Sequence, residues 1–163
     1  MILEIDGEHS GIRFSACHFI PKHEKCSRLH GHSYVLRFRL EGEIGELGMV
    51  MDFVDLKTRL KEFIEKFDHR ILLPRRSQYV QFSEKENSIE VTSCGKKYVF
   101  PKEEVVFLDV SNTTAEEMAM SMVNKIVENT YFPPCIRSVS IGLDEERGQT
   151  VWCTKELNIC QNL

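Results

Sequence analysis

Residues 26–34 of this chain read Cys26-Ser27-Arg28-Leu29-His30-Gly31-His32-Ser33-Tyr34. From residue 30 to residue 40 the pattern alternates, which predicts a β-strand with His32, Tyr34, Leu36, Phe38 and Leu40 on one face. Residues two apart on a strand point to the same side, so His30 and His32 share that face. This strand is the element around which we predict the rest of the fold.

The preceding stretch, residues 12–20, alternates in the same way and predicts a second strand. Ile12, Phe14, Ala16 and His18 share one of its faces, and His18 lies at its end. If the two strands pair antiparallel, the loop between them brings His18 opposite His30 and His32. Three imidazoles with an open fourth position are typical of catalytic zinc, whereas structural zinc sites usually have four ligands, often cysteines. We therefore predict a Zn²⁺ site formed by these three histidines.

Cys26 precedes the His-Gly-His motif by four residues, and spacing alone leaves two roles open for it. Its thiol could act as a base beside the metal, or it could be a fourth ligand. His9 and His23 fit no comparable geometry.

Two helices are predicted on either side of a strand-rich middle segment. The first is capped by Asp52, has apolar residues at helical spacing through Phe67 and ends near Asp68-His69, with Leu72-Leu73-Pro74 stopping it. The second starts at Thr113, where Thr113-Thr114-Ala115-Glu116 fits a capping box.

Short alternating runs at 79–82, 89–92 and 97–100 predict small strands, and residues 136–143 and 150–154 predict a closing hairpin. The order of elements predicts a single α+β domain over residues 1–163. We expect an antiparallel four-stranded sheet with two helices on one face, plus a small β insertion at about 74–110.

Composition narrows the class of function. The chain has 163 residues with a net charge of −4, and a nucleic-acid binder would normally carry a basic surplus. No window approaches the roughly 20 apolar residues of a membrane span, and no signal peptide is evident. The six cysteines contain no Cys-x-x-Cys pair, so we expect reduced thiols in a cytoplasmic protein.

Several motifs together resemble the 6-pyruvoyl-tetrahydropterin synthase family, and its 6-carboxy-tetrahydropterin synthase branch most closely. They are Phe14-Ser15-Ala16-Cys17-His18, residues 26–34, Gly48-Met49-Val50-Met51-Asp52-Phe53, Asp68-His69 and Asn112-Thr113-Thr114-Ala115-Glu116. The resemblance implies a tunnelling fold (T-fold) that assembles as trimers and hexamers with active sites at subunit interfaces. It also implies 7,8-dihydroneopterin triphosphate as substrate. The 6-carboxy branch releases triphosphate and acetaldehyde and feeds the biosynthesis of 7-deazaguanine nucleosides, queuosine or archaeosine.

The resemblance also implies residue roles. His18, His30 and His32 would hold zinc, Cys26 would accept a proton, and His69 with Asp68 would be its relay. A thiol becomes a usable base when a metal and an imidazolium lower its pKa.

A glutamate near the C-terminus would grip the pterin ring in this family. Ile141, Leu143 and Glu145 share a strand face, so we assign this role to Glu145, with Asp144 as the alternative. We expect backbone groups near Thr114 and Ala115 to meet the pterin. Glu116 fits the capping glutamate, and it is also a candidate pterin-binding residue if the anchor is neither Glu145 nor Asp144. The insertion at about 74–110 is longer than in the bacterial sequences, and it could extend the sheet or cover a mouth.

Three alternatives stay open at this point. The product could be a 6-pyruvoyl-tetrahydropterin or a 6-hydroxymethyl-dihydropterin. The domain could be a zinc-stabilised binding module without catalysis, which would unfold on chelation. A zinc hydrolase is disfavoured, because no glutamate lies one residue from the histidine pair.

Overall fold

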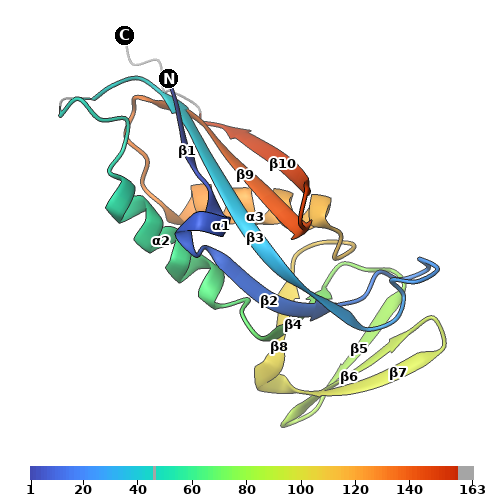
Figure 1. Ribbon diagram of the computed structural model, residues 1–163. Helices are drawn as coiled ribbons and strands as arrows, with labels where there is room; N and C mark the ends of the chain where they lie inside the picture. Colours follow the sequence, from blue (N-terminus) through green and yellow to red (C-terminus); the bar gives the residue numbers. More distant parts are fainter. Residues whose placement is uncertain (46, 158–163) are drawn as a thin grey trace.

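The computed structural model describes residues 1–45 and 47–157, in which a large curved sheet carries two helices on one face (Figure 1). The sheet has the strand order β10-β9-β3-β2-β4-β8, and β1 pairs with β3 beside this path. Its strands are β1 (Ile2–Ile5), β2 (Arg13–His18), β3 (His30–Gly42), β4 (Arg70–Pro74), β8 (Val105–Leu108), β9 (Ile136–Glu146) and β10 (Gln149–Glu156).

Strands β2 and β3 pair antiparallel, as the alternating pattern predicts. The register places Phe14 opposite Tyr34, Ala16 opposite His32 and His18 opposite His30. The inward residues of β2 are buried, and those of β3 from Tyr34 onward continue the same apolar face. The predicted closing hairpin is also confirmed, since β9 and β10 pair around the turn at Arg147 and Gly148.

The two predicted long helices are confirmed and cover one face of the sheet. Helix α2 (Phe53–Glu65) is capped by Asp52, whose carboxylate accepts hydrogen bonds from the backbone N–H groups of Val54 and Asp55. Helix α3 (Ala115–Asn129) lies behind β9 and β10 in Figure 1. Buried side chains from both helices join the sheet in one core, including Leu56, Leu60, Met118, Met122 and Ile126. No helix in the described part of the chain is long and apolar enough to cross a membrane.

The prediction of a four-stranded antiparallel sheet is wrong, because the sheet is larger and mixed. Leu72-Leu73-Pro74, which we predicted to stop the first helix, belongs to strand β4. Helix α2 already ends at Glu65, and β4 then runs parallel to both β2 and β8. A short continuous apolar run is typical of parallel strands, which are buried on both faces. Such a run lacks the apolar–polar alternation from which a strand is predicted. Strand β1 and the short helix α1 (Gly7–Ser10) were also not predicted.

The predicted capping box of α3 is shifted by one residue. Thr114 is the N-cap, and its hydroxyl accepts a hydrogen bond from the N–H of Glu117. Glu117, not Glu116, is the third helical residue, and its carboxylate accepts from Ser111 and Asn112 rather than from the N–H of Thr114, so only the first half of a capping box is formed. The hydroxyl of Thr113 is already used, because it donates to the carbonyl of Phe19.

The three predicted small strands of the insertion form a sheet of their own. Strands β5 (Val80–Glu84), β6 (Ser88–Ser93) and β7 (Lys96–Pro101) pair antiparallel, and a 3-10 turn, η1 (Lys102–Glu104), leads into β8. The insertion therefore does two things: β8 extends the main sheet, and β5–β7 lie below the loop that joins β2 to β3 (Figure 1). A second apolar core unites Phe19 and Leu73 with Val80, Ile89, Val91 and Phe100.

Gly7 offers a test of how tightly α1 is fitted against β3. A Cβ on Gly7 would overlap the carbonyl oxygen of Leu36 and lie 2.9 Å from that of Ile12, and both are backbone atoms that cannot turn aside. We expect Gly7→Ala to destabilise the fold by about 1–3 kcal/mol, the usual cost of overpacking. The melting temperature of Gly7→Ala should fall by several degrees, whereas that of Ser10→Ala, in the same helix, should stay within about one or two degrees of the parent's. A Gly7→Ala melting temperature equal to the parent's would contradict this packing.

Candidate active site

Three histidines meet at the end of the β2–β3 pair where the connecting loop begins. The ligand atoms of His18, His30 and His32 all lie within 4.8 Å of one another. The ring centroids of His18 and His30 are 4.5 Å apart, and those of His30 and His32 are 5.1 Å apart. The predicted convergence of these side chains is therefore confirmed, and the set can hold a metal ion.

Backbone carbonyls orient two of the three rings. His18 Nδ1 lies 2.8 Å from the carbonyl oxygen of Thr113, and His30 Nδ1 lies 2.7 Å from that of Arg28. A carbonyl can only accept, so each Nδ1 carries the proton and each Nε2 keeps its lone pair for a metal. Burial lowers the pKa of His18 to about 4, although the Thr113 bond opposes this shift. At neutral pH His18 is therefore uncharged, which is the form that binds metals.

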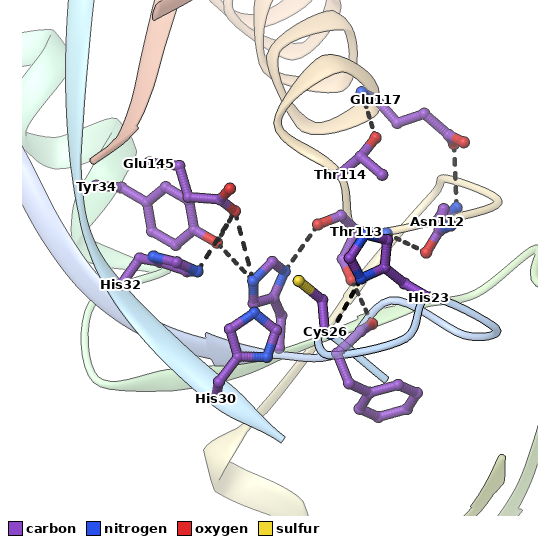
Figure 2. A network of polar contacts seen from close by, with 12 residues as sticks. His23, Cys26, His30, His32, Tyr34, Asn112, Thr113, Thr114, Glu117 and Glu145 are labelled. Atoms are coloured by element: carbon purple, nitrogen blue, oxygen red, sulfur yellow. Dashed lines mark hydrogen bonds and ion pairs between the residues drawn. The ribbon is translucent and has the colours of Figure 1, made fainter. Parts of the chain in front are cut away.

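Tyr34 and Glu145 close the inner side of the cluster, as Figure 2 shows. Glu145 Oε1 lies 3.5 Å from His18 Nε2 and 3.7 Å from His32 Nε2, and it accepts a 3.3 Å hydrogen bond from the Tyr34 hydroxyl. Burial, together with the nearby Glu145 carboxylate, raises the pKa of Tyr34, so its hydroxyl stays protonated and donates. Tyr34 was not predicted as a site residue, although its place two residues after His32 on the same face is the signal that could have found it.

Glu145, not Asp144, faces the histidines. Asp144 is buried on the other side of β9, where its carboxylate accepts from Arg37 Nε at 2.9 Å and from the Thr150 hydroxyl at 2.6 Å. Leu143 pairs with Leu36 across β9 and β3, so strand alternation places Glu145 beside Tyr34.

The thiol of Cys26 is directed toward the histidine cluster from the β2–β3 loop (Figure 2). It does not belong to the set of three mutually close ligand atoms. Hydrogen bonds hold its backbone: the N–H donates to His23 Nδ1 at 3.1 Å, and the carbonyl accepts from the N–H of Ile20 at 2.7 Å. His23 thus contacts the site loop, which the sequence pattern did not indicate. Of the cysteines that the structure describes, Cys17, Cys26, Cys94, Cys135 and Cys153 are free, and Cys160 lies outside the described residues.

Asp68 and His69 lie just before β4, beside β2, and the His69 ring is next to Ser15 and Ser33, which point to the sheet face opposite to His18. The N–H of His69 donates to the carbonyl of Ser15, and the N–H of Ser15 donates to Asp68 at 2.8 Å. That second bond, followed by the one to His69 Nδ1, holds the pKa of Asp68 below its ordinary value. The His69 ring is largely exposed and lines a surface hollow with Ser15 and Ser33. Within the described residues, no polar contact joins it to Cys26.

The segment before α3 contributes a backbone carbonyl to the histidine cluster. Thr113 supplies the carbonyl that holds His18, and Thr114 and Ala115 form the first turn of the helix directly after it. Glu116 is exposed on the outer side of this turn and takes no part in the cap. Thr113 was missed as a site residue because its contribution is a main-chain oxygen, which leaves no side-chain signal in the sequence.

This α+β fold brings three convergent histidines that could hold a metal ion together with an adjacent thiol, which is the arrangement of a candidate metal-site enzyme. The profile of the 6-pyruvoyl tetrahydropterin synthase family matches residues 9–156, and the chain belongs to this family of lyases. A Methanocaldococcus jannaschii protein, provisionally named 6-carboxy-5,6,7,8-tetrahydropterin synthase, is 32% identical over 98% of this chain and 99% of its own length.

Two further comparisons agree with this assignment. The 6-carboxy-5,6,7,8-tetrahydropterin synthase of Rickettsia conorii is 33% identical over 74% of this chain and 79% of its own length. The crystal structure of the Plasmodium vivax 6-pyruvoyl tetrahydropterin synthase superposes with a TM-score of 0.87 at 25% identity, covering 96% of this chain and 99% of that chain. Because the chain belongs to a family of enzymes, the alternative of a binding module without catalysis is disfavoured.

The histidine cluster predicts how the chain binds metal. We expect about one divalent ion per chain, with ring nitrogens roughly 2.0–2.1 Å from a bound zinc ion. His32→Ala should reduce metal content by at least about tenfold, because two remaining imidazoles hold zinc poorly. His9→Ala, which changes an exposed histidine outside the cluster, should leave metal content unchanged. Elemental analysis of the purified proteins tests this. If His32→Ala contains as much metal per chain as the parent protein, the histidine cluster is not the binding site.

Proposed function

We propose that this protein is a zinc-dependent 6-carboxy-5,6,7,8-tetrahydropterin synthase. It would convert 7,8-dihydroneopterin triphosphate to 6-carboxytetrahydropterin, with release of triphosphate and acetaldehyde. The observation that carries the proposal is the convergence of three histidines, two of them oriented by backbone carbonyls, with Cys26 and Glu145 in one site. The names of the relatives from M. jannaschii and R. conorii support this product.

The donor set fits zinc. Three imidazoles that converge on one point are a catalytic zinc donor set, and His18 and His30 have the outer hydrogen bonds that such ligands usually make. A zinc ion bound here would polarise substrate oxygens and stabilise negative charge that develops on them. Side chains of the protein would accept the protons and bind the pterin ring.

Cys26 is the proposed base. The protons that must leave lie on side-chain carbons bearing hydroxyl groups or next to a carbonyl, and they are only weakly acidic. A thiolate held beside the substrate can accept them, and a positioned base of this kind contributes roughly a hundred- to ten-thousand-fold in rate. His69, oriented by Asp68 through the 2.8 Å contact at Nδ1, is the proposed relay for the proton.

A second copy of the chain would bring that relay to Cys26. Within one chain His69 lies on the opposite face of the sheet, exposed to solvent. Apolar side chains at the start of α2 and in the loop before it are also exposed, and they support association between copies: Ile44, Leu47, Met49, Phe53 and Val54. We propose a homo-oligomer of the T-fold type, a trimer or hexamer, with active sites shared between subunits.

Glu145 is the proposed anchor of the pterin ring. The 2-amino and N3 hydrogens of the ring are two donors side by side, and a carboxylate can accept both. The carboxylate accepts a hydrogen bond from Tyr34 and lies beside His18, which places it at the inner end of the site. Backbone groups of Thr114 and Ala115, next to the Thr113 carbonyl, are the proposed further contacts of the ring.

A second candidate product is 6-pyruvoyl-tetrahydropterin. The close superposition with the P. vivax enzyme, which carries that name, favours it. Incubating the purified protein with 7,8-dihydroneopterin triphosphate and identifying the products by mass spectrometry separates the two candidates. Acetaldehyde accompanies only the 6-carboxy product, and detecting neither product would refute the proposed function.

Replacing the thiol tests the base. We expect Cys26→Ala to keep its fold and metal but to lose at least about a hundredfold in turnover. Cys94→Ala, at an exposed cysteine between β6 and β7, is the control and should retain wild-type turnover. If Cys26→Ala loses its metal instead, Cys26 is a ligand and the assigned role is wrong.

Mixing two inactive variants tests the shared site. Cys26→Ala and His69→Ala should each be inactive alone, because each removes one half of the proton relay. When the two are co-expressed, about one quarter of the sites in randomly mixed rings would combine an intact Cys26 with an intact His69 from a neighbour. Recovery of activity near that level is expected. Mixed oligomers without any recovery would show that both residues act within one chain.

Glu145→Gln tests the pterin anchor. The change keeps the side-chain shape but turns half of the acceptor into a donor, and charge-assisted bonds of this type are worth about 1.5–3 kcal/mol. We expect kcat/KM to fall by about tenfold or more, while metal content stays constant. Asp144→Asn serves as a comparison. If kcat/KM falls in Asp144→Asn and not in Glu145→Gln, Asp144 is the residue that binds the pterin ring.

A further inference from the structure

The loop that carries Cys26 is tied at both ends to the small sheet β5–β7. At its first end, Phe19 directly follows His18 and inserts into the second apolar core. Its ring stacks on that of Tyr98 in β7, with centroids 5.7 Å apart, and its backbone carbonyl accepts the hydroxyl of Thr113 at 3.0 Å. The residue next to the metal-site histidine is thus held by the insertion.

At the other end the tie is a lysine. Lys96, at the start of β7, is half-buried, and its Nζ donates to the carbonyl of Ser27 at 2.7 Å and to the Ser27 hydroxyl at 3.2 Å. Ser27 directly follows Cys26. The neighbouring Lys97 points elsewhere and pairs with Glu90 at 3.0 Å on the exposed side of the same sheet. Lys96 and Lys97 therefore differ in direction, as adjacent strand residues must.

Between these two ties most of the loop's hydrogen bonds close on the loop itself. Lys22, His23, Glu24 and Lys25 are exposed, and the bonds of this stretch, including that from the Ile20 N–H to the Cys26 carbonyl, join residues of the same loop. One additional contact again comes from the insertion segment, where the ammonium of Lys22 lies 3.9 Å from the ring centroid of Tyr79. Pro21 is the one buried residue of the stretch 21–25, so the contacts with the insertion decide how far the loop can open locally.

We propose that the β5–β7 sheet is a support for the catalytic loop and that Lys96 is a positioning residue for Cys26. Lys96 holds Ser27, the residue after Cys26, through its carbonyl and hydroxyl oxygens, so that the thiol stays directed at the histidine cluster. Misplacement of a reacting group by about 1 Å can cost about a hundredfold in rate, so such a tie acts on turnover without touching substrate. The expectation for turnover rests on the proposed function, whereas the expectation for thiol accessibility does not.

The experiment compares Lys96→Met with Lys96→Arg and Lys97→Met in the full-length, metal-loaded protein. Lys96→Met keeps the aliphatic length but removes the donors, and Lys96→Arg restores them. With 7,8-dihydroneopterin triphosphate, we expect Lys96→Met to lower kcat by about tenfold with KM and metal content little changed. Lys96→Arg should recover most of the rate, and Lys97→Met, which removes only an exposed ion pair, should match wild type.

The second measurement is the alkylation of Cys26 by iodoacetamide, quantified on the Cys26 peptide by mass spectrometry. Loosening the loop should raise this rate severalfold in Lys96→Met, while exposed Cys17 on β2 reports an unchanged rate. If Lys96→Met does not fold, Lys96→Gln, which keeps a shorter donor, is expected to show both changes to a smaller degree.

Wild-type kcat together with a wild-type alkylation rate in Lys96→Met would overturn the proposal, as would failure of Lys96→Arg to restore either quantity. If the parent protein does not convert the pterin at all, the proposed function fails. The alkylation comparison then still decides whether Lys96 holds the Cys26 loop.

Discussion

The in-register pairing of His18 with His30 across β2 and β3 is the constraint on which the rest of the site depends. It places His18, His30 and His32 on one face of the sheet, directly beyond the apolar row that begins at Tyr34. Strand side chains alternate, so a slip of one residue would turn the histidines of one strand to the opposite face. The same alternation buries Phe14 and Leu36 in the core, and the hydrophobic effect therefore enforces the register that the metal site requires.

Elements distant in the chain then complete what the strand pair begins. The segment capped at Thr114 brings the Thr113 carbonyl to His18, and β9 brings Glu145 to the same ring from the other side. The Tyr34 hydroxyl donates to Glu145 and lies 3.3 Å from His18 Nε2. These polar groups are at the edge of the apolar core, where an unpaired polar atom would be costly, and the described structure leaves no buried side-chain polar atom without a partner.

The two apolar cores position different parts of the site. The larger one sets the positions of β2, β3 and β9, and with them the histidines and Glu145. The smaller one, built by the insertion, receives Phe19 and supports the loop that bears Cys26. Asp68 and His69 belong to neither arrangement, because they are bound to β2 through Ser15. We propose that a second chain brings them to Cys26, and the exposed apolar surface around α2 supports such an association.

The sequence by itself determined the paired strands, the Asp52 cap, the closing hairpin, the small strands of the insertion and the convergence of the histidines. These follow from local alternation and cap chemistry, which short stretches of chain carry within them. Tertiary structure alone decided that Leu72-Leu73-Pro74 forms a parallel strand, since a fully buried apolar run has no periodicity to read. It also chose Thr114 over Thr113 as the cap, because the Thr113 hydroxyl is bound to Phe19, 94 residues away. It placed Asp68-His69 on the far face for the same reason, namely that their partners are distant in the chain.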